Sequence, residues 1–194
     1  MTYTLVAIPK EEDLMVLNRL RNYIYTSGFR FKNKELNSDT HITLASLVMS
    51  EHQIDELEQL LRKNMYRIKQ FTLASSNWEL TKENKDANYK INKPYTWIAI
   101  RFPQLKPLYK LLDALTKELG VNNNMEYIQK VMEIEGTAEA GEYIANHINL
   151  SNYTRREKAD ECWAFFNKQL PNYITFDRLA LRDEKGSLLF TFKM

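Results

Sequence analysis

Two short stretches of the sequence, His41-Ile42-Thr43-Leu44 and His147-Ile148-Asn149-Leu150, agree at three of their four positions. The chain has three histidines, so two of the three occupy the same place in these two tetrads. Each tetrad lies in a β-prone segment, at 40–48 and 144–151, and alternate residues of a strand share a face. We therefore expect the histidine and the polar third residue to face one way, and the two aliphatic residues to face the core.

The segments around the two tetrads follow the same order. The predicted strand at 3–8 ends at Pro9, and leucines at helical spacing then predict a helix over 11–27. Ser50 with Gln53 has the pattern of a capping box, which begins a helix after the first tetrad. Thr154 with Glu157 predicts the same after the second. The remaining expected elements are an extended segment at 66–75, a strand at 95–102, a helix at 105–119, and strands at 173–182 and 187–193.

The sequence thus predicts a strand–helix–strand–helix–strand unit that occurs twice. We expect an α+β protein in which the two copies, about 1–80 and about 94–194, form two pseudo-symmetric lobes of one domain (1–194) around a central cleft. The polar stretch 81–93 is the expected linker. The stretch 121–143 is an addition to the second copy, as a loop, short helix or lid.

Composition narrows the possible classes of protein. Of 194 residues, 44% are apolar and 27% charged, which is typical of a soluble globular chain, and the net charge of +2 does not favour tracking along a nucleic-acid backbone. The single cysteine excludes an internal disulfide and a Cys-based zinc site. Gly136 and Gly141 have P-loop spacing, but Glu142 follows where a lysine is needed. We expect a cytoplasmic protein with no signal peptide, membrane span, metal or cofactor.

The chemistry that the tetrads suggest is proton transfer. Two imidazoles can add one proton and remove another near neutral pH. Thr43 and Asn149 can donate hydrogen bonds to an anion between them, such as a phosphoryl oxygen on which charge accumulates. If the copies are related by a pseudo-twofold axis, these groups meet in one small volume. Metal-free cleavage of a phosphodiester is the reaction that fits this set.

The paired tetrads, on strands of a duplicated unit, resemble the two-histidine (2H) phosphoesterase superfamily of 2′-5′ RNA ligases, 2′,3′-cyclic phosphodiesterases and 2′,5′-oligoadenylate phosphodiesterases. The resemblance implies a 2′-5′ RNA ligase-like fold and a monomer acting on a nucleotide or RNA end with a cyclic or 2′-5′ phosphodiester. It implies His41 and His147 as an acid–base pair, with Thr43 and Asn149 on the phosphate. The superfamily has Ser or Thr at the third position of both tetrads, so Asn149 departs from its pattern.

Other readings remain open at this stage. The same residues could catalyse the reverse reaction, as an RNA 2′-5′ ligase. The site could also have decayed into a nucleotide-binding module, an alternative that Asn149 favours. A third alternative is a scaffold protein that uses only the duplicated fold. Which histidine is the base is not decided. Tyr153 is a further expected substrate contact. Weaker candidates are Phe29-Arg30-Phe31-Lys32, Tyr95, Trp97 and Arg101, whereas His52 is expected on the surface and Cys162 in the core.

Overall fold

The computed structural model describes residues 1–30, 40–82, 94–102, 105–123 and 147–194. Most of the expected linker at 81–93 and most of the expected addition at 121–143 lie outside these ranges, and Thr81, at the start of the expected linker, ends β4. The helices are α1 (Glu11–Thr26), α2 (Glu51–Asn64), α4 (Lys106–Glu118) and α7 (Ala159–Gln169), with 3₁₀ turns η1 (Met65–Arg67), η2 (Ser75–Asn77) and η3 (Arg156–Lys158). The strands are β1 (Thr2–Pro9), β2 (Ile42–Val48), β3 (Phe71–Ala74), β4 (Glu79–Thr81), β5 (Tyr95–Arg101), β6 (Asn122–Asn123), β7 (His147–Arg155), β8 (Tyr173–Arg182) and β9 (Leu188–Lys193).

The predicted order of elements is confirmed. The first half runs β1-α1-β2-α2-β3 and the second runs β5-α4-β7-α7-β8, with β6 between α4 and β7. All the strands belong to one antiparallel sheet, whose main path is β3-β8-β1-β2-β7-β5-β4, while β6 pairs with β2 and β9 with β8. The protein is therefore α+β, as the sequence predicts.

The strand order is close to palindromic about the middle of the sheet. The tetrad strands β2 and β7 are central, and each is flanked by the first strand of its own half, β1 or β5. Beyond these the halves exchange strands: β8, from the second half, pairs with β1, and β4, from the first half, pairs with β5. This order gives the two halves the pseudo-symmetric relation that the repeat predicts.

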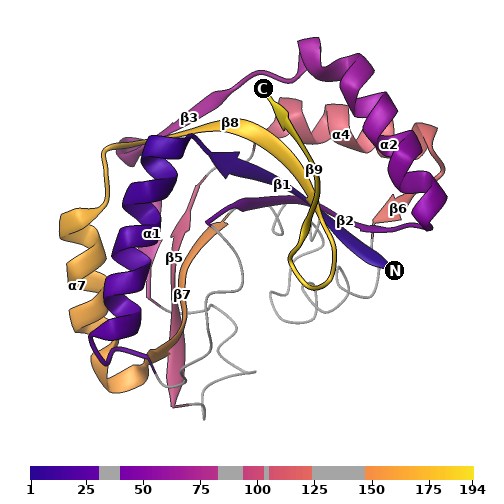
Figure 1. Ribbon diagram of the computed structural model, residues 1–194. Coiled ribbons are helices and arrows are strands. Elements are labelled where there is room, and N and C mark those ends of the chain that lie inside the picture. Colours follow the sequence, from indigo (N-terminus) through magenta and orange to yellow (C-terminus); the bar gives the residue numbers. More distant parts are fainter. Residues whose placement is uncertain (31–39, 83–93, 103–104, 124–146) are drawn as a thin grey trace.

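The two halves of the sheet meet at one pair of residues. Ile42 of β2 pairs with Ile148 of β7, and no other β2–β7 pair occurs among the described residues. We call Ile42–Ile148 the central pair. In Figure 1, β2 and β7 meet near the middle of a strongly bent sheet. Both tetrads therefore lie where the two arms of the sheet join.

The helices cover one face of this sheet, which we call the outer face. Figure 1 shows α1 and α7 along one arm and α2 and α4 along the other. One apolar core joins side chains of all four helices to alternate residues of the strands. Each tetrad contributes its two aliphatic residues to that core, and these are at most 7% exposed: Ile42, Leu44, Ile148 and Leu150. The predicted core-facing positions of the tetrads are thus confirmed.

The two expected capping boxes have different outcomes. The Ser50 hydroxyl accepts a hydrogen bond from the Gln53 amide N–H, and the Gln53 side chain accepts one from Ser50 N–H, so the first is present. The second is wrong. Thr154 is fully buried inside β7, where its hydroxyl donates to Ser151 Oγ (2.8 Å), and α7 begins only at Ala159. Strand pairing extends past this threonine, and it overrides the local helix-start pattern.

One smaller difference concerns the segment after α2. The expected extended segment 66–75 begins as the 3₁₀ turn η1, so β3 occupies only its second part. A turn joins β8 to β9, as the two expected strand ranges require: the Asp183 carboxylate accepts hydrogen bonds from Lys185 N–H and Ser187 N–H. Gly186 in this turn has a φ of +86°, a conformation in which glycine has no Cβ to strain.

Candidate active site

The central pair places the polar residues of the two tetrads side by side. Because β2 and β7 run antiparallel, one step to either side of Ile42–Ile148 brings His41 next to Asn149 and Thr43 next to His147. The aliphatic partners face the outer core, so these four side chains face the opposite, inner face of the sheet. The two histidines occupy a diagonal of this square, a relation that separates residues by roughly 7–8 Å. All four are partly exposed.

Each histidine has an arginine beside it. Arg101, at the end of β5, is the direct register partner of His147 on β7. Arg182, at the end of β8, is buried, and its Nη1 lies 3.1 Å from Nδ1 of His41. Arg101 is one of the weaker sequence candidates. Arg182 was missed, because it lies 141 residues from His41 and no local pattern connects the two.

His147 has an electrostatic environment that disfavours its charged form. Desolvation of the partly buried ring, and then the nearby Arg101 guanidinium, lower the pKa of His147 from 6.5 to about 4. At neutral pH the ring is therefore uncharged and keeps one nitrogen lone pair with which to accept a proton. That is the protonation state a general base needs.

Asn149 has an unmet hydrogen-bonding group. Its side-chain carbonyl oxygen is buried and has no hydrogen-bond partner among the described residues. A buried acceptor without a donor costs free energy. A ligand hydroxyl or N–H that reached this oxygen would remove that cost.

Several other sequence candidates do not join the tetrads. Phe29 packs in the core and Arg30 is buried over the ring of Tyr25, 3.5 Å from its centroid, so the idea that these two hold a nucleotide is wrong. Phe31 and Lys32 lie outside the described residues. Tyr153 belongs to β7, but its side chain is outside the described part of the chain.

The remaining candidates behave as expected or stay open. The His52 side chain is 83% exposed and lies 3.3 Å from Glu56, as a surface residue would. Cys162 is buried in the core, where burial raises the pKa of its thiol to about 12, so it is no nucleophile. Tyr95 and Trp97 are half-buried further along β5.

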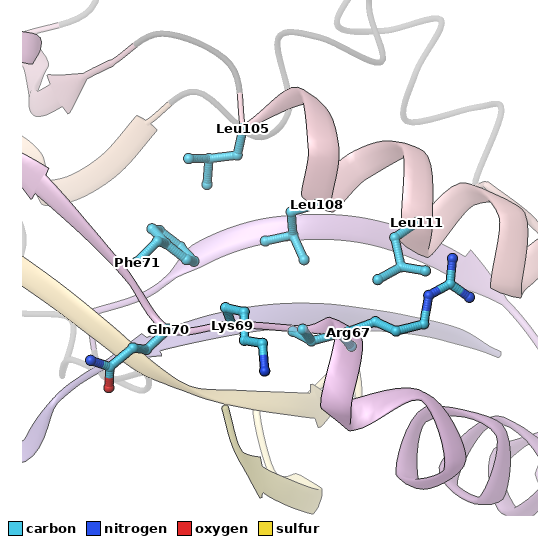
Figure 2. A pocket seen from close by; sticks show the side chains of 8 residues that line it. Arg67, Lys69, Gln70, Phe71, Leu105, Leu108 and Leu111 are labelled. Atoms are coloured by element: carbon cyan, nitrogen blue, oxygen red, sulfur yellow. The ribbon is translucent and has the colours of Figure 1, made fainter.

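A cavity of about 340 Å³ lies elsewhere, between α4 and the segment 67–71. Figure 2 shows Leu105, the residue before α4, and Leu108 and Leu111 of α4 directed toward this segment. Phe71 lines the cavity as well, together with exposed basic and amide side chains, and none of the tetrad residues does so. The residues that line this cavity include no histidine, carboxylate, hydroxyl or thiol, so it lacks the acid–base pair that the tetrads offer. The tetrads remain the candidate active site.

The described residues contain no group of three or more His, Cys, Asp or Glu placed to hold a metal ion. No helix among them is long and apolar enough to span a bilayer.

Comparisons with known proteins give only distant structural similarity. No protein-family model matches the chain, and no curated protein does. Among solved structures, Usb1 of Kluyveromyces marxianus aligns over 100% of this chain and 98% of its own, at 11% identity and a TM-score of 0.46. A structure described as a phosphoesterase aligns over the same shares, at 13% identity and a TM-score of 0.45. Similarity this low says nothing about activity, so a function has to be argued from the residues.

Proposed function

We propose that this protein is a metal-independent phosphodiesterase that uses His41 and His147 as an acid–base pair on a 2′,3′-cyclic phosphate or a 2′-5′-linked nucleotide or RNA end. The observation that supports it most is the central pair, which sets both histidines, Thr43 and Asn149 on one face of the sheet. Two segments that lie far apart in the chain thereby supply the groups that an acid–base reaction needs.

In hydrolysis, His147 takes a proton from a water molecule as the water oxygen attacks phosphorus. The bond between phosphorus and the leaving ribose oxygen breaks, and His41 supplies the proton for that oxygen. His147 is the base in this scheme because its lowered pKa keeps it uncharged at neutral pH. A positioned acid or base typically contributes about 10²–10⁴ in rate.

The groups around the histidines suit an anionic substrate with hydroxyl groups. Arg101 and Arg182 place two guanidinium groups beside the imidazoles. Thr43 can donate a hydrogen bond to a phosphoryl oxygen as negative charge accumulates there. The buried Asn149 oxygen offers an acceptor that a ribose hydroxyl would satisfy. Charge and hydrogen-bonding capacity therefore both favour a nucleotide phosphodiester.

The test is a substrate panel assayed in EDTA: 2′,3′-cyclic mononucleotides, RNA with a cyclic phosphate end, and 2′-5′-linked oligomers. We expect turnover of at least one member. His41→Ala and His147→Ala should each lower turnover by at least about 10². His52→Ala is the matched control and should change little, because its side chain is exposed on α2 and belongs to neither tetrad. Absence of hydrolysis across the whole panel would remove the proposal's support.

Two related functions use the same residues. Ligation of RNA ends, in which a 5′-hydroxyl replaces water as the attacking group, would show as joining of tRNA halves that carry a cyclic phosphate and a 5′-hydroxyl. A nucleotide-binding module without turnover is favoured by Asn149, which stands where the superfamily has Ser or Thr. A large gain of activity in Asn149→Thr would indicate such a decayed site.

A further inference from the structure

The contact between Arg182 and His41 determines which ring nitrogen of His41 carries the proton. A guanidinium has only N–H donors and stays protonated, so it cannot accept a hydrogen bond. The 3.1 Å contact between Arg182 Nη1 and His41 Nδ1 therefore requires Nδ1 to be the acceptor. An imidazole whose Nδ1 accepts has no proton there. Its one proton then lies on Nε2.

We infer that Arg182 is a positioning residue that holds His41 as a neutral ring with its proton on Nε2. Its guanidinium is itself held in place. Arg182 is 5% exposed at the end of β8, where its backbone pairs with Thr4 of β1. From β8 the side chain extends past β1 to the start of β2. A buried, strand-anchored arginine loses little freedom in making this bond, and the imidazole keeps one tautomer.

The tautomer separates the tasks of the two histidines. With Nδ1 engaged by Arg182, His41 presents Nε2–H to the site, which is a donor and not an acceptor. The proton-accepting task then falls to His147, whose uncharged ring is available for it. This assignment of tasks rests on the proposed function, whereas the tautomer itself does not.

The contact also sets a condition on proton delivery. To give up its Nε2 proton and remain a neutral ring, His41 must carry a second proton on Nδ1. An Nδ1–H cannot accept from Arg182, so the contact between the two side chains must open before His41 takes up that proton from solvent. Arg182 therefore disfavours the charged form of His41 until the contact opens.

Nitrogen-15 NMR of the histidine rings tests the inference without any substrate. Long-range proton–nitrogen correlation spectra distinguish a ring protonated at Nε2 from one protonated at Nδ1. The full chain has three histidines, and His52→Gln and His147→Gln assign the signals by elimination. At neutral pH we expect wild-type His41 to be protonated at Nε2 alone. A wild-type His41 ring protonated at Nδ1 would overturn the inference.

Variants of Arg182 test whether this arginine is the reason that His41 is protonated at Nε2. Arg182→Met keeps length but has no donor, so His41 should become a mixture of both tautomers. Arg182→Lys is the second variant, for the case that Arg182→Met does not fold. Lysine also only donates, so His41 should keep its proton on Nε2. The control is Arg178→Met, on the same strand, whose guanidinium contacts the Pro9 carbonyl and Glu11 and not His41. An unchanged His41 spectrum in folded Arg182→Met, or an equal change in Arg178→Met, would refute the role.

The result of the NMR experiment can be distinguished from the result of the substrate panel. If no substrate is turned over but His41 holds its proton on Nε2 only when Arg182 is present, the positioning role stands and the proposed function fails. If the panel shows turnover but the tautomer is indifferent to Arg182, the proposed function stands and this inference fails.

Discussion

The lowered pKa of His147 predicts a specific loss of stability in acid. In the unfolded chain a histidine takes up its proton near pH 6.5, but in the folded protein His147 does so only near pH 4. Between these values the unfolded state binds more protons, so the free energy of unfolding falls as the pH falls. Stability from this group is complete above about pH 6.5 and is lost progressively down to about pH 4.

The size of the loss follows from the two pKa values. Linkage of the folded value of about 4 to the unfolded value of 6.5 gives a loss of about 2 kcal/mol at pH 5 and about 3 kcal/mol at pH 4. Urea unfolding of the wild type and of His147→Gln at pH 7, 5 and 4 measures it, because glutamine has no proton to gain. The difference in unfolding free energy between the two proteins should change by about 3 kcal/mol between pH 7 and pH 4.

One further variant locates the cause. Arg101→Met removes the secondary, coulombic contribution, so the acid-dependent difference should shrink but persist, since burial is the larger cause. A wild-type minus His147→Gln difference that stays constant from pH 7 to pH 4 would refute the reasoning. If His147 is the base, kcat/KM should also fall as the pH drops through about 4.

Two other predictions test the core and a helix end. Cys162, buried and with its thiol pKa raised to about 12, should resist a disulfide reagent at pH 8 in the folded protein and react at once in urea; rapid reaction of the native protein would contradict its place in the core. Ser50→Ala removes the capping box of α2 and should lower the free energy of unfolding by about 1 kcal/mol, measured in urea, whereas an unchanged midpoint would mean that the cap adds nothing.

Much of the fold was predictable because its patterns are local. The leucines of α1 and α4 recur at helical spacing, and Pro9 marks the end of β1. The tetrads could be found because the same short pattern occurs twice. That they meet is a consequence of the central pair, and the sequence suggested it only through the assumption of pseudo-symmetry.

The parts that were missed depend on pairing between distant segments. Thr154 has a helix-start pattern, but β7 continues through it because β5 pairs with it there. Phe29 and Arg30 alternate as a nucleotide-binding strand would, yet the fold buries both. Arg182 reaches His41 only because β8 is inserted beside β1, and no property of the residues near Arg182 reveals that insertion.

The exchange of strands between the halves has a consequence for the nascent chain. On the ribosome, β1 is made long before β8, the strand that completes its second edge. The separation is large: Thr2 N–H donates to Glu184, 182 residues away. Until then one backbone edge of β1 is open to strands of other chains, which invites aggregation. Contacts of such long range also slow folding. A protein truncated before β8 should therefore fail to accumulate in soluble form, even with α1, β2 and the first tetrad intact.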